Sequence, residues 1–349
     1  MPPALIVTGM HRSGTSLMAS FIKALGVNIG ERLFPADNFN VKGYFEDLDI
    51  LEFQRLVLQK SCRTEEAGWP DWGWTESEYL DRDNFKNHMQ TARELIAARE
   101  RTSNIWGWKD PRTTLMLDFW AELLPDARYL FVYRLPWDVA DSILRLNAPV
   151  FTAHPDYPLR IWAFYNRHLL DFYIKYPQRC ILLNINTFLH SPKSAIKLLE
   201  KKLGLEIAHN SAEFSEIYEQ SLFKSLDWQH PLVQLLRQLS PQYFSLLAEL
   251  DRVADMPSNF SDSLVAESEK TPYKEIWPLS LHSKVIESQI QIQYLLSQNH
   301  QQRLELQAEI DKLQQELENI KSSKFWKLKP KLYKMKKLIL GNKNELQGK

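Results

Sequence analysis

The chain has 349 residues, of which 44% are hydrophobic and 25% charged, a composition that excludes a fibrous or disordered protein. Its 43 basic and 43 acidic side chains give a formal net charge of zero, so no overall positive field would attract nucleic acid. The two cysteines, Cys62 and Cys180, lack metal-ligand spacing, and no apolar run is long enough to span a membrane. These features predict a reduced, cytoplasmic protein that needs no metal.

The first predicted element is a buried strand over residues 4–8, and a loop bounded by Gly9 and Gly14 follows it. A helix begins after the loop. Strand, tight loop and helix N-terminus together form a phosphate cradle, because the first N–H groups of a helix have no internal partner and its dipole favours an anion. The spacing is that of a P-loop, but Thr15 occupies the lysine position and the cation has moved back to Arg12.

The missing lysine disfavours an enzyme that acts on the γ-phosphate of a nucleoside triphosphate, because that lysine reaches the β- and γ-phosphates. An arginine in the loop can instead grip a single terminal phosphate with its planar fork. The loop resembles the 5′-phosphosulfate-binding loop of the sulfotransferases that use 3′-phosphoadenosine 5′-phosphosulfate (PAPS). The resemblance implies that the donor is bound by Arg12, Ser13, Gly14, Thr15, Ser16 and Leu17. The alternative is a strand–helix turn whose glycines serve only geometry.

An irregular connection over residues 28–43 comes next, and a helical pattern follows from about Asp47 to Lys60. A general base is expected in a transferase with a hydroxyl acceptor, because an alcohol attacks better as its proton departs. Related sulfotransferases carry a catalytic glutamate after the first helix, which makes Glu46 the first choice. Glu31, Asp47 and His11 remain competitors. The alternative for Glu46 is a helix-start acid that complements the dipole.

Three tryptophans, Trp69, Trp72 and Trp74, lie within six residues of a second irregular stretch. Aromatic faces stack on sugar rings, so this stretch would form a wall of an acceptor cleft. The favoured alternative is a satellite hydrophobic cluster under a long loop. A helix is predicted next, over residues 76–101.

A short strand over residues 105–108 precedes Lys109, Asp110 and Pro111, and a helix is predicted over 113–124. Ligands of open α/β sheets bind beyond the carboxyl ends of the strands, so Lys109 is expected in the same crevice as the loop. The segment resembles the Lys-Asp-Pro element of tyrosylprotein and related bacterial sulfotransferases, which implies that Lys109 contacts the transferring group. Asp110 and Pro111 are expected to shape the turn and cap the helix.

A buried strand over residues 128–133 ends at Arg134, and Pro136 opens a helix predicted over 136–147 that carries Ser142. An arginine at a strand end with a serine eight residues later resembles the 3′-phosphate motif of the same family. The resemblance implies that Arg134 and Ser142 bind the 3′-phosphate. The alternative is a surface charge beside an ordinary helix serine.

Helices over 159–176 and 192–203 and a strand over 180–185 complete the alternation of strands and helices. This alternation predicts an α/β domain over residues 1–255, a three-layer sandwich with a mostly parallel sheet like that of P-loop NTPases. The resemblance implies in-line transfer of a sulfuryl group from PAPS to an acceptor hydroxyl without a metal. The acceptor is expected to be a glycan or glycolipid, with a protein tyrosine or a small metabolite as the alternatives. The catalytic residues are expected to be Glu46, Lys109 and Arg12. A P-loop nucleotide kinase and a non-catalytic nucleotide-binding scaffold are the alternatives.

Beyond this domain the sequence predicts a linker over 256–282, within a polar, helix-poor stretch that begins near Asp251, and a coiled-coil helix over 283–321. The apolar a/d seam of the helix comprises Val285, Ile292, Leu296, Leu306, Ile310, Leu313, Leu317 and Ile320, with polar seam positions at Asn299 and Arg303. A parallel or antiparallel homodimer is expected. The alternative is a single amphipathic helix that folds back on the first domain.

A basic amphipathic tail is predicted over residues 322–349. Eight lysines lie between positions 321 and 337, with no acidic residue among them and with Phe325, Trp326 and Tyr333 interleaved. This pattern suits contact with an anionic bilayer, so the protein is expected to be peripheral to the inner face of the membrane. Nucleic acid or an anionic polysaccharide fits the same pattern, as does a merely solvated tail.

Overall fold

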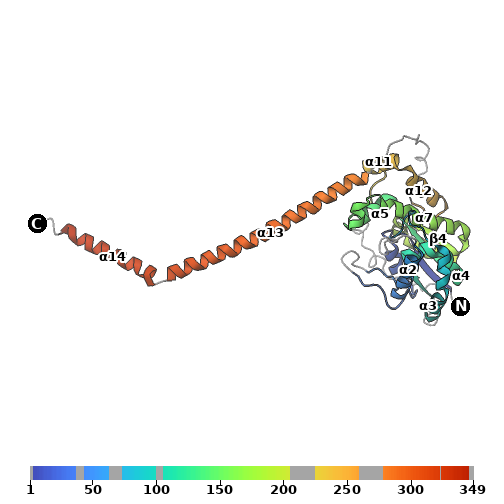
Figure 1. Cartoon of the computed structure of the whole chain (residues 1–349), viewed down its shortest axis with the longest axis horizontal. Coiled ribbons are helices and arrows are strands. Elements are labelled where there is room, and N and C mark those ends of the chain that lie inside the picture. Colours follow the sequence, from blue (N-terminus) through green and yellow to red (C-terminus); the bar gives the residue numbers. More distant parts are fainter. Residues whose placement is uncertain are drawn as a thin grey trace. The chain divides into compact units, whose positions relative to one another are not determined.

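The structure is a computed structural model, and it describes residues 3–36, 43–62, 73–99, 105–204, 225–258, 278–322 and 324–345. The chain divides into two compact units, Met1–Ser283 and Lys284–Lys349, each described here by itself. The first unit contains the predicted phosphate loop, and the second consists of helices (Figure 1).

A parallel four-stranded sheet lies at the centre of the first unit, with the strand order β2-β1-β3-β4. The four strands are β1 Ala4–Thr8, β2 Trp106–Lys109, β3 Arg128–Tyr133 and β4 Cys180–Asn184. All four were predicted to within one residue, because strands covered on both faces form continuous apolar runs. In the register of the sheet, Val7 pairs with Lys109 and Thr8 with Phe131, so the carboxyl ends of β1, β2 and β3 meet at one edge.

Helices cover both faces of this sheet, which confirms the predicted three-layer α/β fold. On one face, Leu5 and Val7 of β1 share a hydrophobic core with α1 Thr15–Ala24, α8 Ile185–His190 and α9 Pro192–Leu203. On the other face, the Phe172 ring of α7, Tyr157–Lys175, lies 5.0 Å from that of Tyr129 and 5.9 Å from that of Phe131. This alternation along each strand directs successive side chains to opposite layers.

The remaining described helices of the first unit lie around these layers. They are α2 Leu48–Ser61, α3 Met89–Arg99, α4 Leu117–Leu123, α5 Pro136–Leu144, α6 Pro149–Ala153, α11 Pro231–Leu239 and α12 Pro241–Val253. Short 3₁₀ helices occur at Arg82–His88, Pro111–Met116 and Pro177–Arg179.

Two predicted helix starts were wrong. The helix predicted over 76–101 begins as a 3₁₀ helix at Arg82 and becomes α-helical only at Met89. Its expected first turn is a capped turn instead, because Glu78 Oε2 accepts hydrogen bonds from both the backbone N and the hydroxyl of Thr75. The helix predicted over 113–124 likewise starts as a 3₁₀ turn over 111–116, which Asp110 caps at the backbone N of Arg112, 2.8 Å away.

The end of the first unit also differs from prediction. Helix α12 continues to Val253, so the stretch from Asp251 is helical at its start, and residues 259–277 lie outside the described ranges. Helix α13 runs over Pro278–Ser322, so it begins within the predicted linker and continues through the start of the second unit at Lys284. Helix α14 runs over Lys324–Glu345. None of the helices that the structure describes combines the length and the hydropathy that a membrane crossing requires.

Candidate active site

The carboxyl edge of the sheet brings together the loop after β1 and the ends of β2 and β3. The Thr8 hydroxyl lies 2.8 Å from the Asp110 carbonyl oxygen, to which it donates, and 2.8 Å from the Thr114 hydroxyl. Asp110 N donates to Val7 O at 3.2 Å. The phosphate loop and the Lys-Asp-Pro segment are therefore joined at their bases by buried hydrogen bonds.

Both glycines that bound the loop are required by close approach. A Cβ on Gly9 would lie 2.1 Å from the carbonyl oxygen of Val132, and a Cβ on Gly14 would lie 2.5 Å from Ile185. Gly14 also has a φ of +92°, in the left-handed region that favours glycine. The loop thus passes directly against β3 and the start of α8, which fixes where α1 begins.

The start of α1 has the features of an anion site. Gly14 is the N-cap residue, and no side chain among the described residues caps the helix. The buried Ser13 hydroxyl oxygen has no hydrogen-bond partner within the described chain. Arg12 has a φ of +65°, and this left-handed turn lies directly before the helix N-terminus. Uncapped amides, a buried hydroxyl and a cation at one helix start suit a phosphate group.

On the β3 side of the loop, Arg12 Nε donates to Ser142 Oγ of α5 at 3.0 Å. Arg134 is only 3% exposed, and its carbonyl oxygen accepts a 2.9 Å hydrogen bond from Trp162 Nε1. Burial lowers the pKa of Arg134, Asp138 opposes this effect, and the nearby Arg12 adds to it. The structure therefore places Arg12, Arg134 and Ser142 in one basic group, called here the β3-side group.

Asp138, which sequence reasoning did not identify, balances this group. Its Oδ2 lies 3.6 Å from Arg134 Nε and accepts a 2.7 Å hydrogen bond from Ser225 Oγ, and its Oδ1 accepts one from Leu226 N at 3.2 Å. The sequence signal was present, because Asp138 stands four residues after Arg134 at the start of a helix that Pro136 opens.

On the β2 side of the loop, the Lys109 ammonium is only 2% exposed and has three acceptors. Its Nζ lies 2.5 Å from Glu46 Oε1, 2.9 Å from the Tyr44 carbonyl oxygen and 3.1 Å from Ser16 Oγ. Ser16 is in the first turn of α1. Lys109, at the end of the neighbouring strand β2, therefore brings a cation to the start of this helix, where the lysine of an ordinary P-loop is missing. Lys109, Glu46, Ser16 and Tyr44 are called here the β2-side group.

Glu46 is buried, and burial raises its pKa although Lys109 pulls in the opposite direction. Its second carboxyl oxygen, Oε2, has no hydrogen-bond donor among the described residues. The preceding residue, Phe45, has a φ of +62°, a left-handed conformation that is unfavourable for a bulky side chain and costs roughly 1–2 kcal/mol. Backbone strain thus accompanies the turn that brings this carboxyl beside Lys109.

Of the competing bases, Asp47 rather than Glu46 caps α2. Asp47 Oδ1 accepts hydrogen bonds from the backbone N of Asp49 at 3.0 Å and of Ile50 at 3.3 Å. The same oxygen also lies 2.6 Å from Arg99. The helix-start interpretation considered for Glu46 therefore applies to Oδ1 of its neighbour, whereas Asp47 Oδ2, like Glu46 Oε2, is buried and has no hydrogen-bond partner among the described residues. What distinguishes Glu46 is its ion pair with Lys109.

The other two competitors are also less suited to accept a proton. Glu31 is exposed to solvent. The pKa of His11 is lowered well below its usual value, first by burial and then by Arg112, Lys109 and Arg12. A neutral imidazole with so low a pKa is a weak base near neutral pH.

Four of the tryptophans near the predicted site are core residues, whereas Trp228 is 37% exposed. Trp74, Trp106, Trp108 and Trp162 are each at most 2% exposed. For Trp74 the hydrophobic-cluster interpretation is correct and the acceptor-wall interpretation is wrong, because a fully buried ring cannot stack on a sugar. Trp69 and Trp72 lie outside the described residues.

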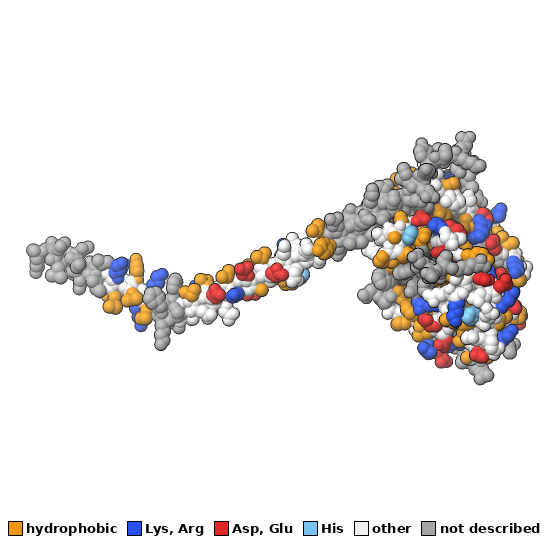
Figure 2. Space-filling view, viewed as in Figure 1, with side chains coloured by type: hydrophobic (Ala, Val, Ile, Leu, Met, Phe, Trp, Pro, Cys, Tyr) orange, Lys and Arg blue, Asp and Glu red, His pale blue; other side chains and the backbone are white. Residues whose placement is uncertain are grey.

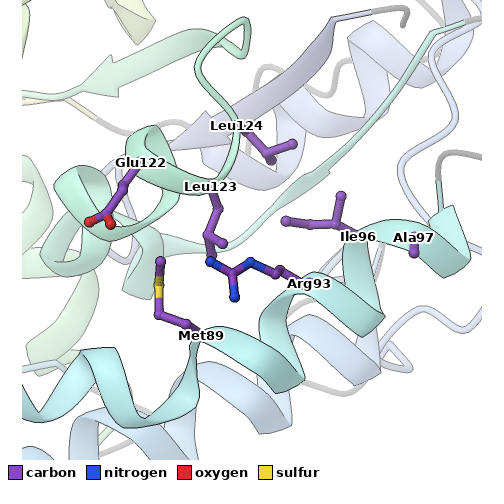
Figure 3. A pocket seen from close by; sticks show the side chains of 7 residues that line it. All are labelled: Met89, Arg93, Ile96, Ala97, Glu122, Leu123 and Leu124. Atoms are coloured by element: carbon purple, nitrogen blue, oxygen red, sulfur yellow. The ribbon is translucent and has the colours of Figure 1, made fainter.

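A pocket of about 340 Å³ lies between α3 and α4 (Figure 3). It is lined by Met89, Arg93, Ile96, Ala97, Glu122, Leu123 and Leu124. Leu124 precedes the first residue of β3, so this pocket adjoins the amino edge of the sheet, opposite the loop edge. None of the predicted site residues lines it.

Comparison with known proteins gives one family. The sequence model described as "Sulfotransferase family" matches residues 3–209. No curated protein sequence matches the chain.

Among solved structures, the chain is similar to a sulfotransferase domain of the Synechococcus PCC 7002 olefin synthase, with 17% identity, 74% of this chain and 96% of that chain covered, and a TM-score of 0.41. It is also similar to the sulfotransferase STF9 from Mycobacterium avium, with 15% identity and a TM-score of 0.43. The match covers 73% of this chain and 77% of that chain. A sulfotransferase from Alicyclobacillus acidocaldarius has 12% identity and a TM-score of 0.40. The match covers 74% of this chain and 98% of that chain.

Proposed function

Because this chain belongs to the sulfotransferase family, we propose that it transfers a sulfuryl group from PAPS to a hydroxyl group of an acceptor. The observation that carries the PAPS proposal is the division of cations around one phosphate loop. Arg12, Arg134 and Ser142 gather on the β3 side, and Lys109 with Glu46 lies on the β2 side. A donor with phosphate at both ends of its ribose and a reactive group beyond one of them matches this division.

The loop fits the 5′-phosphate of the donor. The uncapped first turn of α1, the unsatisfied Ser13 hydroxyl and the Arg12 guanidinium would bind it, with hydroxyls from Thr15 and Ser16 nearby. Arg134 and Ser142 would bind the 3′-phosphate. PAPS supplies a sulfuryl group that is activated by its bond to a phosphate leaving group.

The β2-side group would act on the acceptor. In this proposal the acceptor hydroxyl donates its proton to Glu46 Oε2, the buried oxygen that lacks a donor among the described residues. The raised pKa of Glu46 makes it a stronger base than an ordinary carboxylate. Lys109 would neutralise negative charge that develops beside Ser16, where its ammonium already lies. Positioning of the reactants and stabilisation of charge supply most of the rate acceleration in such a displacement.

Isothermal titration tests the donor proposal. We expect 3′-phosphoadenosine 5′-phosphate, the product of transfer, to bind without metal and more tightly than ATP·Mg²⁺. Arg12→Ala and Ser142→Ala should weaken that binding, and Arg93→Ala and Ser245→Ala, at surface positions on α3 and α12, are the matched controls. Preference for ATP·Mg²⁺ would favour a nucleotide kinase, and equal weakening by the controls would remove the assigned site.

For the acceptor, we retain a hydroxyl of a glycan or glycolipid. A buried carboxylate base supports an alcohol as the nucleophile, and the lysine-rich α14 supports an acceptor at a membrane surface. The buried Trp74 cannot contribute to an aromatic wall for such an acceptor, and Trp69 and Trp72 lie outside the described residues. The basic α14 would hold the enzyme peripherally on an anionic bilayer.

Flotation with anionic liposomes tests this location. The full chain is expected to float with vesicles that contain phosphatidylserine, and a chain ending at Asn319 is expected to stay in the dense fraction. Added salt should release the full chain, because lysine-based attraction is screened. Equal flotation of the two chains would contradict the proposal.

A further inference from the structure

Helix α13 exposes a row of apolar side chains along its described part. Positions a and d of the heptads are Arg303, Leu306, Ile310, Leu313, Leu317 and Ile320. The apolar members of this row, called here the seam, are 46% to 59% exposed in the single chain. Figure 2 shows these hydrophobic side chains beside acidic and basic ones on the same helix. An apolar row of this spacing on a long helix is expected to be buried by a partner helix.

The side chains that flank the seam indicate the orientation of that partner. The g positions carry Glu309 and Glu316, and the e positions carry Gln307, Gln314 and Lys321. In a parallel two-stranded coil each g residue faces the e residue five positions later on the other helix. Glu316 then faces Lys321 of the partner subunit. In an antiparallel coil g faces g, which would bring glutamates together.

From this charge complementarity we propose that two copies of this chain pair in parallel through the seam of α13, over residues 303–321. Ile310 at an a position between Leu306 and Leu313 at d positions is the pattern that favours two strands, whereas Leu317 at a and Ile320 at d form the pattern of larger assemblies. The number of strands is therefore decided by the sedimentation experiment below. Arg303 at an a position would fix the register, since a polar residue there tolerates only one alignment. This inference does not depend on the reaction of the first unit.

The composition of α14 indicates where the pairing ends. From Lys324 to Asn344 this helix carries lysines and no acidic residue. In a parallel dimer these lysines would face lysines of the other copy, which opposes association. The coil is therefore expected to end near Lys321, and both copies present their basic helices at the same end.

Disulfide crosslinking of the full chain tests the orientation. In a Cys62→Ser background, Leu306→Cys and Ile320→Cys lie at d positions near opposite ends of the seam. Each variant alone is expected to form a covalent dimer on mild oxidation, because parallel helices bring identical positions together. Gln315→Cys, on the outer f position, is the matched control and should remain monomeric. Crosslinking only when the two seam variants are mixed would overturn the parallel arrangement.

Charge exchange tests the same proposal without cysteines. We expect sedimentation velocity of the full chain to give about twice the 41.0 kDa chain mass. Glu316→Lys should raise the dimer dissociation constant roughly tenfold, since two attractive pairs become repulsive, and Lys321→Glu added to it should restore the affinity. An antiparallel dimer would be tightened by Glu316→Lys instead. A chain that is monomeric at all concentrations, or a tetramer, would overturn the proposal.

Discussion

The two sides of the phosphate loop neutralise their buried cations in different ways. On the β2 side, the Lys109 ammonium is enclosed by a carboxylate, a carbonyl oxygen and a hydroxyl at hydrogen-bonding distance. On the β3 side, Arg12 and Arg134 lie close enough for each to disfavour the charge of the other, and Asp138 Oδ2 is 3.6 Å from Arg134. In the proposed function, the β2 side would move a proton beside a fixed cation, and the β3 side would receive an anion.

The largest expected effect is that of Lys109→Ala. Removing this ammonium should lower kcat by about 10³-fold, since a buried cation at the site of developing charge is worth roughly 2.7–4 kcal/mol, and should leave the dissociation constant of the donor product within about twofold. Steady-state kinetics with titration measures both. Lys175→Ala, an exposed lysine paired with Asp118, is the matched control. If Lys109→Ala weakened donor-product binding as strongly as it lowered kcat, the division into a catalytic β2 side and a donor-binding β3 side would be wrong.

Glu46→Gln should lower kcat by about 10²-fold and leave donor binding unchanged, because it removes the base and retains an acceptor for Lys109. Burial raises the pKa of Glu46, and only its ionised form accepts a proton, so wild-type kcat should rise with pH through that raised pKa. The variant should lose this rise. If kcat of Glu46→Gln still rose with pH as in the wild type, the general base would be another residue.

Arg134→Gln should have the opposite signature. Donor-product binding should weaken about 30-fold, since a hydrogen bond to a charged group contributes about 1.5–3 kcal/mol, and kcat at saturating donor should change little. Titration and kinetics separate the two effects. Arg145→Gln, an exposed arginine at the opposite, C-terminal end of α5 that pairs with Asp141, is the control. A large kcat loss with unchanged affinity would place Arg134 on the catalytic side.

The smallest effect concerns His11, whose pKa is lowered first by burial and then by nearby cations that include Arg112, Lys109 and Arg12. The unfolded imidazole takes up a proton near pH 6.5 while the folded one stays neutral, so below that pH the unfolded state binds more protons. The free energy of unfolding should therefore fall by about 1 kcal/mol between pH 6.5 and 5.5 because of this residue. Urea unfolding of His11→Gln at both pH values should show a smaller fall. An identical fall would mean that the pKa of His11 is not lowered in the folded protein.

Sequence reasoning located the strands and the loop because buried parallel strands and glycine-bounded turns are local patterns. It could not locate the start of the 82–99 helical segment, since a side chain of Glu78 decides that the preceding turn is capped. It named Lys109 and Glu46 separately, and their ion pair joins residues 63 positions apart, a contact that only the fold creates. Asp138 was missed although its helical spacing from Arg134 was visible.

For the heptads of α13, the sequence shows more than the structure does. Their spacing and their e and g charges can be read from the sequence. The structure adds that α13, taken by itself, leaves the seam exposed.

Transfer of radioactive sulfate from ³⁵S-labelled PAPS tests the central claim most directly. The full chain would be incubated with labelled donor and, in separate reactions, a glycan mixture, a glycolipid extract in anionic vesicles and tyrosine peptides. We expect covalently bound label in a carbohydrate-containing product, lost in Lys109→Ala and kept in Lys175→Ala. Binding of the donor product without transfer to any acceptor would contradict it and leave a nucleotide-binding scaffold.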